Sequence, residues 1–114
     1  MFDFQKLNVY QKAKAYNFEI TDLLETVHFD RHIVDQLKRA SFSIMLNIAE
    51  GTSRYSSKDK RNFFIISRGS AFECVAILEF LFESNKINEK TYENLLSKLE
   101  EISKMLYALI KNLE

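Results

Sequence analysis

The chain has 114 residues, 46% of them hydrophobic and 28% charged, with no proline and only two glycines. This size suits one globular domain with a core of its own, and so few turn residues exclude all-β and collagen-like proteins. Sixteen basic and sixteen acidic side chains balance, so net charge alone does not indicate nucleic-acid binding.

Several features bear on the cellular compartment. No apolar run approaches the roughly 20 residues of a membrane span, and the first residues lack the basic-then-apolar layout of a signal peptide. The lone Cys74 excludes an internal disulfide and a multi-cysteine metal site. We therefore expect a cytoplasmic protein that has no membrane partner.

Apolar residues recur at helical spacing from the start of the chain. In the first predicted helix they are Val9, Ala13, Tyr16, Ile20, Leu23 and Val27. The pattern breaks at residues 28–32, where Asp30 is the predicted N-cap of a second helix. The apolar positions of that helix are Ile33, Leu37, Ala40, Ile44 and Ile48. We expect it to stop at Gly51, a residue that favours the C-terminal cap of a helix.

The second half of the chain repeats this organisation. A polar loop leads to Ser56 and Asp59, which have the spacing of a capping box and begin a third helix that ends near Glu83. Asn88 is the predicted cap of the fourth helix, whose apolar positions run from Tyr92 to Leu113. Four helices of roughly 20 residues with short connections predict an all-α fold, an up-down-up-down antiparallel four-helix bundle, formed by residues 1–114 as a single domain.

The third helix has more apolar surface than one contact face needs. One stripe contains Phe64, Ala71, Val75, Leu78 and Phe82, and a second contains Ile66, Ser70, Glu73, Ile77 and Phe80. Every helix of a four-helix bundle keeps an outer face, and monomers seldom expose large apolar patches. We therefore expect the second stripe to be covered by another subunit of a homo-oligomer.

Polar and small residues line one face of the second helix, at Gln36, Ala40, Ser43, Asn47 and Glu50. Gly69, Ser70 and Glu73 of the third helix fall at the same level of an antiparallel pair. A glycine inside a helix costs ~1 kcal/mol, so we expect a neighbouring backbone to approach Gly69. We predict a buried, hydrogen-bonded cluster of Asn47, Glu50 and Glu73, and the candidate partners of its carboxylates are Arg39, Arg54 and Arg68.

No arrangement of residues indicates catalysis. Glu50 and Glu73 lack the histidines that a di-metal bundle site requires, and His28 and His32 lie together in a loop without a carboxylate-rich partner helix. No nucleophile motif or phosphate-binding loop is present, and Cys74 is interpreted as a packing residue. We predict no enzymatic activity, cofactor or metal. The polar cluster is interpreted as fixing helix register and assembly, with a binding site as the alternative.

The two ends of such a bundle differ in charge. The basic end (residues 1–15, 41–66 and 102–114) has nine lysines and arginines against four acids, whereas the other end has seven against twelve. The densest basic segment lies at the start of the third helix, where the helix dipole is already positive. We expect phosphate contacts from this segment, assistance from the first helix and stacking by an aromatic residue; the residues are Arg54, Lys58, Lys60, Arg61, Lys6, Lys12, Lys14 and Tyr55. A solvated surface without a ligand is the alternative.

Three segments resemble a known signature. They are Gln36–Ile44, Asn47–Gly51 followed by Arg54, and Gly69–Glu73. They are similar to the four-helix-bundle family of 23S rRNA intervening-sequence proteins, which are small bacterial proteins, and the accessory protein of diversity-generating retroelements is similar in fold. Within these segments the predicted signature polar cluster consists of Gln36, Arg39, Ser43, Asn47, Glu50, Gly51, Gly69, Ser70 and Glu73.

The resemblance implies a ring-like homopentamer without an established enzymatic activity. It also implies nucleic-acid binding, which in the retroelement relatives involves RNA or DNA and a reverse transcriptase. Together with the charge pattern, it predicts a non-enzymatic, homo-oligomeric protein that binds RNA or DNA through its basic end without base specificity. The alternative is a protein-interaction scaffold that binds no nucleic acid.

Overall fold

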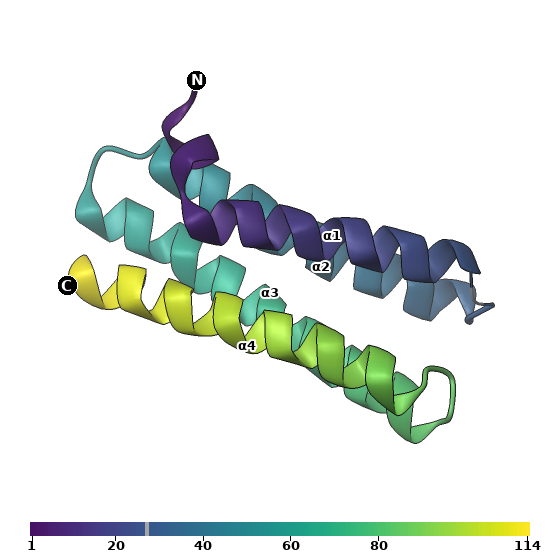
Figure 1. The fold of residues 1–114 in the computed structure, drawn as a ribbon. Helices are drawn as coiled ribbons and strands as arrows, with labels where there is room; N and C mark the ends of the chain where they lie inside the picture. The colour runs from purple at the N-terminus through teal and green to yellow at the C-terminus, as the bar shows by residue number, and fades with distance from the viewer. Residues whose placement is uncertain (27) are drawn as a thin grey trace.

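The computed structural model, which describes residues 1–26 and 28–114, places four helices side by side in an antiparallel arrangement (Figure 1). A short 3-10 helix η1 (Asp3–Lys6) precedes α1 (Asn8–Thr26), α2 (Arg31–Thr52), α3 (Ser57–Glu83) and α4 (Glu89–Asn112). Over the described residues there is no strand. The predicted apolar position Val27 lies outside the described residues.

Each helix contacts the next one along the chain, and α1 also contacts α4. Within the part of the chain that the structure describes, no Cα atoms of the diagonal pairs α1–α3 and α2–α4 lie within 8 Å of each other. This pattern confirms the predicted up-down-up-down four-helix bundle. The bundle measures 44 × 24 × 22 Å, and none of its described helices is long and apolar enough to cross a membrane.

Side-chain caps begin three of the helices where the sequence predicts them. The Asp30 carboxylate accepts a hydrogen bond from the His32 amide at 3.0 Å, and the Ser56 hydroxyl accepts one from the Asp59 amide at 3.1 Å. Asn88 accepts from the Thr91 amide at 2.7 Å. Each cap satisfies an amide that has no partner inside its helix, which fixes where the helix starts.

The predicted role of Gly51 is wrong. The second helix continues through Gly51 to Thr52, and its C-cap is Ser53, which keeps a right-handed backbone. Gly51 is instead a buried packing position, because a Cβ atom there would lie 2.7 Å from Cε1 of Phe64. The absent side chain therefore leaves room for a core ring of α3.

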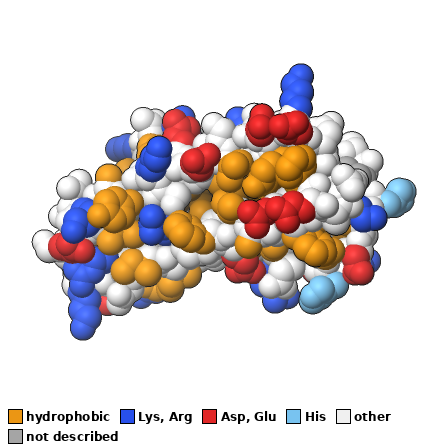
Figure 2. Space-filling view, turned by 90° about the horizontal axis from the view of Figure 1, so that it is seen from below, with side chains coloured by type: hydrophobic (Ala, Val, Ile, Leu, Met, Phe, Trp, Pro, Cys, Tyr) orange, Lys and Arg blue, Asp and Glu red, His pale blue; other side chains and the backbone are white. Residues whose placement is uncertain are grey.

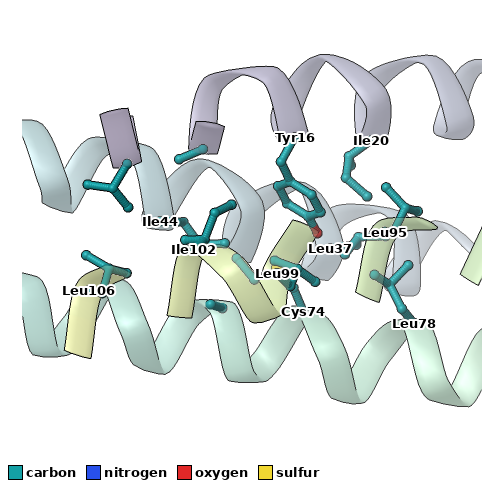
Figure 3. Close-up of a cluster of buried hydrophobic side chains, with 14 of the residues drawn as sticks. Tyr16, Ile20, Leu37, Ile44, Cys74, Leu78, Leu95, Leu99, Ile102 and Leu106 are labelled. Atoms are coloured by element: carbon teal, nitrogen blue, oxygen red, sulfur yellow. The ribbon is translucent and has the colours of Figure 1, made fainter. Parts of the chain in front are cut away.

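The core contains apolar side chains from all four helices (Figure 3). It also includes three buried polar groups that connect helices. The Ser41 hydroxyl donates to the hydroxyl of Tyr16 at 3.3 Å and lies 3.5 Å from the Cys74 sulfur. Asn17 donates to the Ser41 carbonyl at 2.9 Å, and Ser67 donates to the Ile44 carbonyl at 2.7 Å. Each of these groups has a partner, so the core carries them without an unpaired polar atom.

Burial also changes the acidity of two core groups. Removal from water raises the pKa of Tyr16 well above its ordinary value, and it raises the pKa of the Cys74 thiol as well. A thiol that is buried and protonated is a poor nucleophile. The interpretation of Cys74 as a packing residue agrees with its complete burial in the core.

Candidate nucleic-acid interface

The α2–α3 loop, η1 and the end of α4 lie at the same end of the bundle (Figure 1). Lysine and arginine side chains gather at this end on the side seen in Figure 2, together with a few acidic ones, and histidine side chains lie toward the other end. Tyr55, in the loop, is fully exposed. The basic end therefore presents an uncovered aromatic ring among cations.

Two of the predicted phosphate ligands contact the protein itself. The Lys60 ammonium donates to the Thr52 carbonyl at 3.3 Å, and the Arg61 guanidinium donates to the Leu113 carbonyl at 3.3 Å. These carbonyls lie at the C-terminal ends of α2 and α4, where cations interact favourably with the helix dipole. Both side chains are partly buried, so stabilising the helix ends is one role of Lys60 and Arg61.

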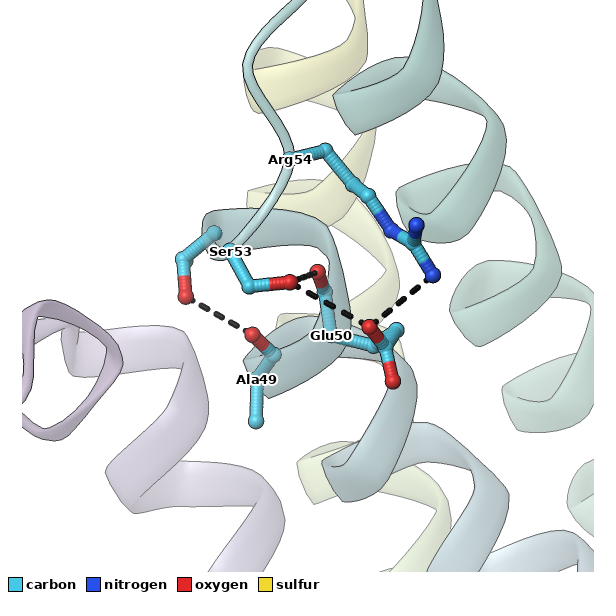
Figure 4. A network of polar contacts seen from close by, with 5 residues as sticks. Ala49, Glu50, Ser53 and Arg54 are labelled. Carbon is cyan, nitrogen blue, oxygen red and sulfur yellow. Dashed lines mark hydrogen bonds and ion pairs between the residues drawn. The ribbon is translucent and has the colours of Figure 1, made fainter.

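Arg54 is also held in place. Its guanidinium lies 3.0 Å from the Glu50 carboxylate, to which the Ser53 hydroxyl donates as well (Figure 4). The same guanidinium lies over the ring of Phe63, 4.5 Å from its centroid. Both members of the ion pair are nearly half exposed, so the pair contributes little to stability. It orients Arg54 at the surface beside the loop.

The remaining predicted cations divide into two groups. Lys58 and Lys6 are exposed and make no hydrogen bond or ion pair within the described residues. Lys12 forms an ion pair with Glu101 of α4 at 3.2 Å, and Lys14 lies 5.7 Å from the centroid of the Tyr10 ring. Among the predicted ligands, Lys58 and Lys6 therefore have the greatest freedom to contact a nucleic acid.

Two further cations of this end, Lys104 and Lys111, were not predicted ligands, and Lys104 is exposed. Lys111, near the end of α4, forms an ion pair with Glu114 at 3.1 Å. The hydrogen bond to Glu114 raises the pKa of this ammonium group. Lys111 therefore stays charged, but its charge is locally offset.

The predicted buried polar cluster does not form, because Glu50 and Glu73 are exposed and neither bonds to Asn47. The stripe divides into separate contacts along the α2–α3 seam. In the first contact, the Gln36 side chain donates to the Glu73 carboxylate at 3.1 Å. In the second, at another level of the seam, the Ser43 and Ser70 hydroxyls lie 2.7 Å apart.

Asn47 completes the second of these contacts. Its side-chain amide donates to the carbonyl and the hydroxyl of Ser43, at 2.8 and 3.0 Å. Ser43, Asn47 and Ser70 therefore connect α2 and α3 at a partly buried level of the seam. Their hydrogen bonds are short and local, which suits a role in helix register.

Two of the three arginines predicted to partner the carboxylates do not. Arg39 is exposed. Arg68 faces α4, where it donates to the Ser103 carbonyl at 3.3 Å and lies over the rings of Phe72 and Tyr107. Only Arg54 pairs with a carboxylate of the stripe, that of Glu50.

The prediction that a neighbouring backbone approaches Gly69 is wrong for contacts within the chain. Gly69 is exposed, and a Cβ atom built on it would meet no atom within 4 Å. No backbone of the same chain approaches it.

The sequence matches the family of 23S rRNA-intervening sequence proteins over residues 5–108. The protein belongs to this family. A solved structure of a protein of unknown function from the S23 ribosomal protein family of Bacteroides thetaiotaomicron is similar, with a TM-score of 0.85 and 27% sequence identity. The alignment covers 90% of this chain and 98% of that one. The comparison with curated proteins gives no match.

Neither the family's description nor that of the solved structure names an enzymatic activity. The described residues of this intervening-sequence protein hold no group of three or more His, Cys, Asp or Glu side chains placed to bind a metal ion. His28 and His32 are both exposed. The chemistry that the surface offers is hydrogen bonding, charge and apolar contact.

Apolar side chains are exposed on the outer face of α3 in this family member, as the sequence predicts. Ile66 and Phe80 of the predicted second stripe are about half exposed, whereas Ser70 of that stripe is buried. Ile65 and Phe72, which were not part of the stripe, are about half exposed as well. Sequence reasoning missed a second outer face on α2, where Phe42 and Leu46 are also about half exposed. Their helical spacing, opposite the apolar stripe of α2, is the signal that could have identified them.

Proposed function

We propose that this protein is a non-enzymatic bundle that assembles with copies of itself and binds the phosphate backbone of RNA or DNA through its basic end. The observation that carries the proposal is the fully exposed Tyr55, three residues before the exposed and unpaired Lys58. Aromatic rings stack on unpaired bases of any sequence, and lysines contact phosphates of any sequence. Binding is therefore independent of base sequence and favours single strands.

The positive charge of this end has more than one source. Lys58 lies in the first turn of α3, where the amide groups that lack helical partners add positive potential. Lys6 adds a second unpaired cation from η1, which contacts α2. Arg54 keeps donors free for a phosphate because Glu50 uses one of its terminal nitrogens.

Self-assembly has separate support. Half-exposed apolar side chains gather on the outer faces of α2 and α3, and exposed apolar side chains that lie together often mark sites of association. Light scattering at micromolar concentration is expected to give a mass several times 13.4 kDa. The resemblance to pentameric proteins favours a value about five times the mass of one chain. A mass of 13.4 kDa would contradict self-assembly.

The test of nucleic-acid binding is fluorescence anisotropy with short single-stranded and duplex RNA and DNA over a range of salt. Log affinity should fall with log salt, by about 0.7 per phosphate contacted on a single strand. Lys6→Gln/Lys58→Gln should reduce this slope by about 1.4 and weaken binding. The matched control, Lys86→Gln/Lys90→Gln, removes two positive charges from the acidic end and should leave binding unchanged.

These two variants are preferable to substitutions of Lys60 and Arg61, whose loss would also remove hydrogen bonds to helix-end carbonyls. Equal binding by the Lys6/Lys58 variant and the wild type would contradict the assignment of these ligands. If the wild type binds no nucleic acid at low salt, the second candidate function remains. That function is a protein-interaction scaffold, which the exposed apolar faces of α2 and α3 favour.

A further inference from the structure

Gly69 occupies a position in α3 that the single chain does not explain. It lies near the middle of a 27-residue helix, where glycine costs about 1 kcal/mol relative to alanine. Nothing in the chain would contact a Cβ atom there. The space above Gly69 is therefore open to another molecule, and a side chain at this position would occupy it.

The open space has apolar walls. Gly69 lines a hollow of about 360 Å³ on the α3–α4 seam, together with Ile65, Phe72, Tyr107, Ile110 and Arg68. We call it the Gly69 hollow. The Arg68 guanidinium is held over the Phe72 and Tyr107 rings and by the Ser103 carbonyl, so this wall is fixed. Figure 2 shows the side of the bundle formed by α3 and α4, on which apolar side chains lie among charged ones.

The same chain carries protruding side chains that suit such a hollow. Phe42 and Leu46 are one turn apart on the outward side of α2, and each is about half exposed. We call this pair the α2 knobs. Two protruding side chains one turn apart can pack into a groove between two helices, as ridges pack into grooves between helices.

We infer that the α2 knobs of a second copy of this chain fill the Gly69 hollow. The inference rests on the self-assembly proposed above and identifies the surfaces that perform it. This contact would explain why position 69 is a glycine, since a side chain there would exclude the incoming Phe42 or Leu46. The occupant is a second copy because one sequence supplies both the unfilled hollow and the uncovered knobs.

The exposed apolar area is sufficient for a specific contact. Five large side chains form the two surfaces, and each is about half exposed: Phe42, Leu46, Ile65, Phe72 and Tyr107. At roughly 200 Å² for each side chain, about 500 Å² of apolar surface is available. A standard interface of about 1,600 Å² takes roughly 900 Å² from apolar groups. The knobs and the hollow supply more than half of that amount.

The two surfaces lie on different helices, so the contact joins unlike faces. Such a contact leaves one free knob pair and one free hollow at the ends of every open chain of copies, and repeating it closes a ring when the rotation allows. A contact between like faces would stop at a dimer instead. This difference makes the pairing testable by mixing two defective variants.

The test uses Gly69→Trp, which fills the hollow, and Phe42→Gln/Leu46→Gln, which removes the knobs. Both variants change exposed positions, so circular dichroism should show folded helices. Each alone should have a mass of 13.4 kDa by light scattering. An equimolar mixture retains one intact knob pair and one intact hollow, and should give a complex of twice that mass and no larger. Ala15→Trp, at an exposed position of α1, is the matched control and should assemble like the wild type.

The outcomes separate the inference from the proposed function. A wild-type protein that is monomeric at micromolar concentration overturns both. A wild type that assembles while either variant keeps its full mass overturns the pairing and leaves self-assembly in place. Two monomeric variants that do not combine when mixed also overturn the pairing, because the contact between unlike faces requires them to combine.

Discussion

The buried hydrogen bond between Ser41 and Tyr16 gives the most specific prediction for stability. Ser41 and Tyr16 are both fully buried, and their hydroxyl groups are 3.3 Å apart. Ser41→Ala removes the donor and leaves the Tyr16 hydroxyl with only the weakly polar Cys74 sulfur nearby. A buried polar group that loses its partner costs about 1–3 kcal/mol. We expect Ser41→Ala to lower the free energy of unfolding by about 2 kcal/mol.

The double variant should cost less than the two single variants together. Tyr16→Phe alone removes an acceptor and should cost about 1 kcal/mol, whereas Tyr16→Phe/Ser41→Ala leaves neither hydroxyl unpaired. The cycle should therefore show a coupling of at least about 1 kcal/mol, measured by urea unfolding with circular dichroism at one protein concentration. Ser97→Ala, at an exposed position of α4, serves as the control and should change stability by less than about 0.5 kcal/mol. Additive effects of Tyr16→Phe and Ser41→Ala would refute the coupling.

Three further outcomes follow from the described contacts. Gly51→Ala should lower the melting temperature because the new Cβ would lie 2.7 Å from the Phe64 ring, which outweighs the helix preference of alanine. An unchanged or higher melting temperature would contradict this packing. Stability should fall as the pH rises above about 10, since the unfolded chain ionises Tyr16 while burial, which raises its pKa in the folded chain, keeps it protonated. Tyr16→Phe should reduce that slope by up to about 1.4 kcal/mol per pH unit in alkaline urea titrations, and identical slopes would argue against it. Glu73→Ala should change the free energy of unfolding by less than about 1 kcal/mol, because Glu73 is exposed and its single bond comes from Gln36; a loss of several kcal/mol in urea unfolding would show that it is covered.

Helix positions and helix starts followed from the sequence because both are encoded locally. The spacing of apolar residues marks a buried face, and Asp30, Ser56 and Asn88 bond to amides two or three residues away. The role of Gly51 was mispredicted because it depends on a contact with another helix and is not encoded locally. Glycine is common at helix ends and at close contacts, and only the approach of Phe64 from another helix distinguishes the two roles.

The candidate site was only partly predictable. Charge counting located the basic end, but it could not show that Arg61 reaches the Leu113 carbonyl, 52 residues away in sequence. Periodicity placed Glu50 on a polar face of the second helix and Glu73 at the same level of the third, but it could not show that both side chains are exposed. The direction of a side chain is a local property, whereas its burial depends on what the neighbouring helix covers.

Both ends of the chain lie at the end of the bundle that carries the α2–α3 loop (Figure 1). Any peptide fused to either terminus therefore emerges at the same end of the bundle as the loop that contains Tyr55. A cationic affinity tag would add charge where phosphates are expected to bind, and a bulky fusion partner would block the approach of a strand. A fluorophore attached at the α3–α4 turn, at Asn85 for instance, would report on the protein from the opposite end and leave that approach open.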